Sequence, residues 1–197
     1  LHLCDYNLET VSNYNSNAKH DLLAEVCMAA KYEGNSINSH YPKHEHSNKD
    51  TGTASQLCTV LARSFADIGD IVRGRDLYLG NDDEERKKRK QLDDNLKTIF
   101  GKIYKDLKTE NGALQARYNG DDNNNYSKLR EDWWNANRAT IWEAITCEVK
   151  SGNNYFRQTC CSGEWTDDKC RCKNKKPGKS ETDQVPTYFD YVPQFLR

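Results

Sequence analysis

The residues with the clearest chemical potential are the cysteines, of which the chain has eight. Half of them fall in one short stretch, and the full set is Cys4, Cys27, Cys58, Cys147, Cys160, Cys161, Cys170 and Cys172. Cysteines at this density either cross-link an extracellular protein or coordinate zinc as thiolates. Adjacent and Cys-x-Cys pairs match poorly the wider spacing of structural zinc sites, so the pattern favours disulfides. Eight cysteines allow 105 pairings, and the sequence alone does not choose among them.

A second possible metal site lies in the segment His40-Tyr-Pro-Lys-His44-Glu-His46. Three histidines this close together are able to hold a transition metal. The segment is polar, however, and no neighbouring groups are in view that would orient the imidazole rings. We therefore interpret it as a solvated loop and expect neither a metal nor a cofactor.

Signatures of the common catalytic sites do not occur in the sequence. The segment Gly69-Asp-Ile-Val-Arg-Gly74 lacks the lysine and the hydroxyl residue that a phosphate-binding loop needs. No Gly-x-Ser-x-Gly or His-Glu-x-x-His motif is present. Acidic residues are abundant, but none lies in an apolar stretch that would raise its pKa for general acid catalysis. We expect no catalytic residues and a protein that is not an enzyme.

Clustered positive charge is the remaining functional signal. The net charge is only −1, so local clusters matter more than the total. The candidate glycan-binding residues form a basic run and its continuation on one predicted helix: Arg86, Lys87, Lys88, Arg89, Lys90, Lys102, Lys105 and Lys108. A second basic cluster comprises Lys169, Arg171, Lys173, Lys175, Lys176 and Lys179.

Basic clusters of this kind bind sulfated glycans, anionic membranes or nucleic acids. Nucleic acid is the weakest candidate for a disulfide-rich extracellular segment. The alternative is a solvated helix face whose cations are balanced by the acidic residues that precede the run.

Apolar residues at helical spacing predict the elements that position these groups. The expected helices cover about 20–33, 54–72, 82–108 and 127–149, and Gly34 is expected to end the first of them. Residues 34–53 and 109–126 are expected to be long polar loops. Three tryptophans in the last helix are interpreted as core packing. The two prolines in 185–193 predict an extended, packed strap, and 195–197 the beginning of another helix.

Apolar residues make up 36% of the chain, which predicts a thin core that benefits from covalent cross-links. No apolar run is long enough to span a membrane, and the first residues lack the features of a signal peptide. We therefore expect export or anchoring signals to lie outside this segment, which we interpret as part of a longer protein.

Several sequence blocks together resemble one protein family. They include Cys27-Met-Ala-Ala-Lys-Tyr-Glu-Gly34, Leu129-Arg-Glu-Asp-Trp-Trp134, Cys170-Arg-Cys172 and Val185-Pro-Thr-Tyr-Phe-Asp-Tyr-Val-Pro193. The blocks occur in the family's order and cover nearly the whole chain. The sequence resembles a Duffy-binding-like domain of the alpha class, from the erythrocyte membrane protein 1 family of Plasmodium falciparum.

The resemblance implies a mainly α fold, a disulfide-linked helical bundle with long irregular loops and three subdomains. Residues 1–19 would end the first subdomain or form a connection, 20–150 would form the second, and 151–197 would be a Cys-rich strap entering an incomplete third. It also implies that Cys58 pairs with Cys147, and that the partners of Cys170 and Cys172 lie beyond Arg197.

The function implied is that of an adhesin on the infected red-cell surface, within a longer membrane-anchored protein. Its implied partners are host red-cell receptors and glycans (heparan sulfate, blood-group sugars and complement receptor 1) and host antibodies. Rosetting and antigenic variation belong to the same expectation, whereas nucleic acid and direct membrane contact do not. The alternative is a structural scaffold that displays variable loops and positions a neighbouring receptor-binding domain.

Overall fold

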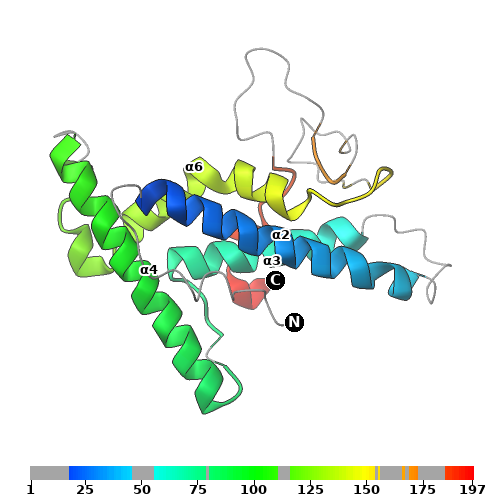
Figure 1. Ribbon diagram of the computed structural model, residues 1–197, viewed down its shortest axis with the longest axis horizontal. Coiled ribbons are helices and arrows are strands. Elements are labelled where there is room, and N and C mark those ends of the chain that lie inside the picture. The colour runs from blue at the N-terminus through cyan, green and yellow to red at the C-terminus, as the bar shows by residue number, and fades with distance from the viewer. Residues whose placement is uncertain are drawn as a thin grey trace, which may run out of the picture.

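The structure, a computed structural model, describes residues 18–45, 56–78, 80–110, 116–153, 155, 166, 169–172 and 185–197. Within these ranges the elements are the α-helices α2 (Ala18–Glu45), α3 (Gln56–Arg73), α4 (Asp83–Glu110) and α6 (Ser127–Ile145), with the 3-10 helices η1 (Asp121–Asn124), η4 (Phe189–Tyr191) and η5 (Gln194–Leu196). Helices α2, α3 and α6 run side by side, and α4 crosses one end of this layer and projects from it (Figure 1). The expected mainly α fold is confirmed.

The aromatic core lies between α3 and α6. Phe65 contacts Trp134 and Trp142 with ring-centroid distances of 5.1 and 5.2 Å, and Trp133 meets Phe100 of α4 edge-on at 6.0 Å. All three tryptophans are buried, which confirms their expected role in core packing.

Helix α2 continues to Glu45, well past Gly34, where the sequence predicted that it ends. The prediction of a loop is therefore wrong for residues 34–45. Gly34 is buried against α6, where a Cβ atom would lie 2.0 Å from the carbonyl oxygen of Ile145. Beyond it, Asn38 donates a hydrogen bond to the Glu148 carbonyl oxygen at 2.9 Å. The glycine therefore permits a close helix contact instead of ending the helix. Residues 46–53 of the expected loop lie outside the described residues.

Part of the second expected loop is also ordered. The Asp121 carboxylate accepts hydrogen bonds from the backbone N–H groups of Lys128 and Leu129 at 3.0 and 2.9 Å. These N–H groups belong to the first turn of α6 and have no partner within the helix. Asp121 is therefore a fixed cap for α6, although it lies six residues before the helix begins.

The disulfide pairing differs from the one that the resemblance implied. Cys58 is bonded to Cys170, 112 positions later, whereas Cys147 is a free thiol. Cys172 is also disulfide-bonded, to a sulfur outside the described residues. The pairing of Cys58 with Cys147 is therefore wrong, and so is the expectation that Cys170 and Cys172 need partners beyond Arg197.

Local contacts explain why Cys170 reaches Cys58. Trp142 donates its indole N–H to the Cys170 carbonyl oxygen at 3.1 Å. Arg171 donates to the Thr146 hydroxyl and to the Glu143 carbonyl oxygen at 2.8 and 2.7 Å. These bonds hold residues 169–172 against the end of α6, and Cys170 is fully buried there.

The segment 185–197 packs on α3 and α6 through a buried carboxylate. Both oxygens of Asp190 accept hydrogen bonds from Arg138 at 2.8 Å, and one also accepts the Trp134 indole N–H at 2.9 Å. The Asp190 side chain has no exposed surface, and its backbone carbonyl accepts a bond from Arg73. The expected packing of this segment is found, but residues 189–191 form the 3-10 helix η4 instead of an extended strap. A short helix does occur where 195–197 were expected to begin one, as the 3-10 helix η5.

Substituting Gly34 by alanine tests the close helix contact. Alanine normally stabilises a helix interior by up to about 1 kcal/mol relative to glycine. Here we expect the opposite sign, a loss of about 2 kcal/mol or more, because the new methyl group overlaps the Ile145 carbonyl. Urea unfolding followed by circular dichroism measures the difference, with the exposed Ser36→Ala on the same helix as the control. A stabilised Gly34→Ala variant would show that the two helices are further apart.

Substituting Cys170 by serine tests the disulfide. Cross-linking residues 112 positions apart contributes about 4–5 kcal/mol in the chain-entropy model, so this variant should lose most of that stability. The variant Cys147→Ser should lose much less. A larger loss in Cys147→Ser would restore the pairing that the resemblance implied.

Substituting Asp190 by asparagine tests the buried carboxylate. The change leaves the Arg138 guanidinium buried without its counter-charge, and we expect a loss of about 3–5 kcal/mol in unfolding free energy. The exposed Asp122→Asn is the control and should change stability by less than about 0.5 kcal/mol. Equal unfolding midpoints for the two variants would contradict the role given to Asp190.

Candidate functional site

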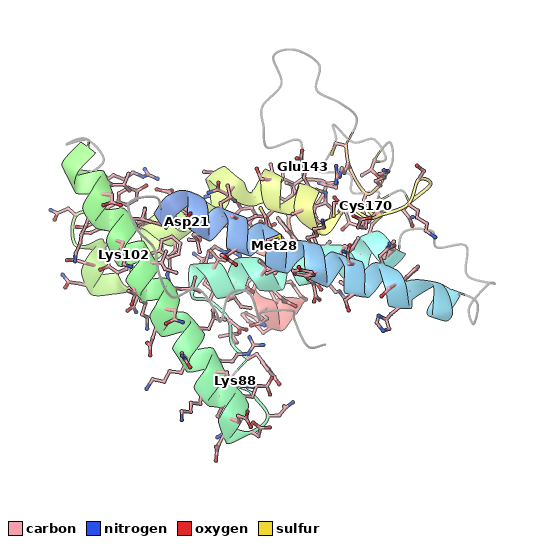
Figure 2. All side chains as sticks on the ribbon, viewed as in Figure 1. Asp21, Met28, Lys88, Lys102, Glu143 and Cys170 are labelled. Carbon is pink, nitrogen blue, oxygen red and sulfur yellow. A yellow bond between two sulfur atoms is a disulfide. The ribbon has the colours of Figure 1, made fainter. Side chains whose placement is uncertain are left out.

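The candidate glycan-binding residues lie on α4, which has two different halves. Leu92, Leu96, Ile99 and Ile103 are buried and attach the second half to the bundle. The first turns carry no apolar side chain and project away from the other helices (Figure 1). Lys88 lies on this projecting half, and Lys102 lies on the attached half (Figure 2). One continuous helix therefore presents the whole basic run.

Most of the run's cations form ion pairs within the protein. Two pair with acidic residues one turn earlier at 3.0 and 3.3 Å, namely Arg86 with Asp83 and Lys88 with Glu84. Arg89 is tied more firmly, because its guanidinium bonds Asp76 at 2.6 Å and lies 4.8 Å from the centre of the Tyr78 ring. Arg89 thus anchors α4 to the connection that precedes it, and the three pairs lower the charge that the run presents to solvent.

Three exposed lysines of the predicted set, on the outer face of α4, differ from Lys88 in having no ion pair among the described residues. In the described part of the chain, Lys87, Lys90 and Lys105 form no ion pair, and all three side chains are exposed. Lys87 and Lys105 are 18 residues apart, which corresponds to about 27 Å along the helix. Lys102 is half-buried, and the side chain of Lys108 lies outside the described residues. The structure therefore supports a smaller and more dispersed basic face than the sequence predicted.

The second basic cluster falls mostly outside the described residues. Of its two described members, Lys169 is exposed, whereas Arg171 donates to acceptors at the end of α6. Arg171 therefore has a structural role, because a cation at the C-terminal end of a helix is favourable.

The histidine segment begins on α2 and not in a loop. His40 is exposed, and its Nδ1 atom lies 2.7 Å from the carbonyl oxygen of Ser36. The side chain of His44 and the whole of His46 lie outside the described residues. Within the residues described, no group of three or more His, Cys, Asp or Glu side chains is placed to hold a metal ion. None of the described helices is long and apolar enough to cross a membrane.

Two carboxylates on α3 have raised pKa values that the sequence did not lead us to expect. Burial raises the pKa of Asp67 and of Asp70 on α3, while the positive charge of Arg197 acts in the opposite direction. Arg197 bonds Asp67 at 3.0 Å and also contacts Asp70, which pairs with Arg73 at 3.0 Å. These carboxylates form an ion-pair network with the C-terminal segment. Their sequence neighbours gave no sign of this network, because Arg197 lies 127 positions from Asp70.

Residues 1–197 match the family model of the Duffy binding domain. No curated protein matches the sequence. Seven chains of solved structures match it.

Two of these structures come from the PfEMP1 protein of the Plasmodium falciparum varO strain. They contain the NTS-DBL1-alpha and CIDR-gamma double domain and the NTS-DBL1(alpha-1) domain. Both are 44% identical to this chain over 99% of its length, with a TM-score of 0.73. This chain covers 25% of the first and 40% of the second, so it spans less than half of either relative.

A third structure is the ICAM-1-binding DBLbeta domain of the IT4var13 PfEMP1. It is 33% identical over 100% of this chain, with a TM-score of 0.66, and this chain covers 39% of it. Together these matches confirm the resemblance seen in the sequence. The chain belongs to the Duffy binding domain family, and within it to the Duffy-binding-like domains of Plasmodium falciparum erythrocyte membrane protein 1.

Proposed function

We propose that this chain is part of an extracellular adhesin domain that binds host receptors or glycans at the surface of infected red cells. The observation that carries the proposal is family membership, since a related domain with the same fold binds ICAM-1. Display within a longer membrane-anchored protein, rosetting and antigenic variation complete the proposal. The proposed domain division has the end of a first subdomain or a connection at 1–19, a second subdomain at 20–150, and a Cys-rich strap and the entry to a third at 151–197.

Within this function, the outer face of α4 is the proposed contact for anionic glycans of the heparan sulfate type. Lys87 and Lys90 support this assignment, because both are exposed, lie three residues apart and form no ion pair among the described residues. Lys105 extends the same face. Exposed lysine–sulfate contacts are individually weak and strongly screened by salt, so several must act together. Complement receptor 1 and neutral blood-group sugars are further proposed partners, and they need contacts other than charge.

The ion pairs of Arg86, Lys88 and Arg89 favour a second candidate function. If internal acidic residues balance the run, α4 serves as a rigid arm of a scaffold that positions a neighbouring receptor-binding domain. A glycan array distinguishes the two functions. The adhesin function predicts binding by the present chain, whereas the scaffold predicts a blank array and binding only by a longer domain.

Reversing two charges tests the α4 face directly. The variant Lys87→Glu with Lys90→Glu should elute from a heparin column at clearly lower salt, with roughly tenfold weaker binding near physiological ionic strength. The control is Lys31→Glu with Lys150→Glu, which makes the same change in net charge at exposed positions outside α4. Elution of the Lys87→Glu with Lys90→Glu variant at the same salt as the unaltered chain would exclude α4 as the glycan contact. An equal shift of both variants would show that only total charge matters.

A further inference from the structure

The projecting half of α4, residues 83–91, has no apolar side chain that could hold it against the bundle. A helical segment this short is only marginally stable in water when nothing packs on it. Its own ion pairs are exposed, and exposed pairs contribute little. This half nevertheless carries Lys87 and Lys90, on which the proposed glycan contact depends. Contacts with another part of the chain are therefore needed to keep it helical.

The connection between α3 and α4 supplies such contacts. It runs beside the projecting half (Figure 1). Its backbone lies directly on the first turn of α4, because a Cβ atom added at Gly80 would lie 2.9 Å from the Arg86 backbone nitrogen. The Tyr78 hydroxyl donates to Glu85 at 3.1 Å, and the centre of the Tyr78 ring lies 4.8 Å from the Arg89 guanidinium carbon. The connection and the projecting half therefore pack as one unit.

The carboxylate of Asp76 closes this unit. Its Oδ2 accepts a hydrogen bond from Arg89 at 2.6 Å, and the two side chains are only 16% and 18% exposed. Its Oδ1 accepts bonds from the Tyr78 N–H group and from Gln194 Nε2, both at 3.1 Å. A short charge-assisted bond between half-buried groups is stronger than an exposed ion pair. Asp76 therefore ties α4 both to the connection and to the C-terminal segment.

We propose that Asp76 is a positioning residue for the basic face of α4. By bonding Arg89 it keeps residues 83–91 helical, and this fixes the spacing and direction of Lys87 and Lys90. Asp76 repels a polyanion and does not contact it, so it acts only through Arg89. Its effect on binding rests on the proposed glycan contact, whereas its effect on the order of α4 does not.

Because Asp76 is negatively charged, charge alone and positioning predict opposite results for Asp76→Asn. Removing a negative charge beside a basic face should strengthen the binding of a polyanion if only charge matters. If Asp76 positions the face, the same change should weaken binding. The matched control is Asp83→Asn, which removes an equal charge from the exposed partner of Arg86. This control should elute from heparin at slightly higher salt than the unaltered chain.

We expect Asp76→Asn to elute from heparin at lower salt, with about threefold or more weaker binding near physiological ionic strength. Hydrogen exchange at the amides of residues 87–91 should become about tenfold faster, while exchange in α3 and α6 stays unchanged. Asp83→Asn should alter exchange at these amides by less than about twofold. Asp76→Glu keeps the carboxylate and should recover part of both effects.

Elution of Asp76→Asn at the same or higher salt than the unaltered chain would overturn the effect on binding. Unchanged exchange at residues 87–91 would overturn the positioning role itself. So would exchange that rises equally in α3 and α6, because Asp76 would then stabilise the whole domain. If Lys87→Glu with Lys90→Glu elutes like the unaltered chain, the proposed glycan contact fails, and the exchange measurement alone then decides the role of Asp76.

Discussion

The buried pairing of Asp190 with Arg138 is the interaction on which the rest of the arrangement depends. A carboxylate without exposed surface is stable only when fully paired and hydrogen-bonded, and Asp190 has Arg138 and Trp134 for this purpose. Because Arg138 and Trp134 lie on α6, the pairing fixes the C-terminal segment on the helical layer. It also defines how far that segment reaches across α3, where its backbone meets Arg73.

Several other features follow from that position. With the C-terminal segment in place, Arg197 reaches Asp67 and Asp70, and Gln194 reaches the α3–α4 connection. The same connection carries Asp76, which bonds both Gln194 and Arg89 at the start of α4. A continuous series of polar contacts thus runs from the core of the bundle to the projecting helix. The orientation of the basic face therefore depends on residues more than a hundred positions away in sequence.

Apolar periodicity predicted α3, α4 and α6 well, because each has a distinct buried stripe that the sequence displays. It failed for α2, because a glycine can either end a helix or let a neighbouring backbone approach closely, and the sequence does not distinguish the two roles. The close contact with the Ile145 carbonyl shows that Gly34 has the second role. The basic run was found, and two of its ion pairs match the alternative in which the preceding acidic residues balance its charge. The acidic partners of Arg86 and Lys88 can be read from the sequence, because they precede them by one helical turn. The pairing of Arg89 with Asp76 cannot, because it depends on how the connection before α4 folds back on the helix. The pairing of Cys58 with Cys170 depends on contacts that Trp142 and Arg171 make in the folded chain, and the spacing of cysteines in the sequence does not reveal these contacts.

The outer face of α4 suits one kind of proposed partner for physical reasons. Its lysines are exposed and widely spaced, so they favour a flexible polyanion whose charges can be matched one by one in water. A neutral sugar offers no charge to match and gains instead from groups of complementary shape that exclude water. The projecting half of α4 carries no apolar side chain, so this face does not suit a neutral ligand. Recognition by charge and recognition by shape therefore need different surfaces of the same domain.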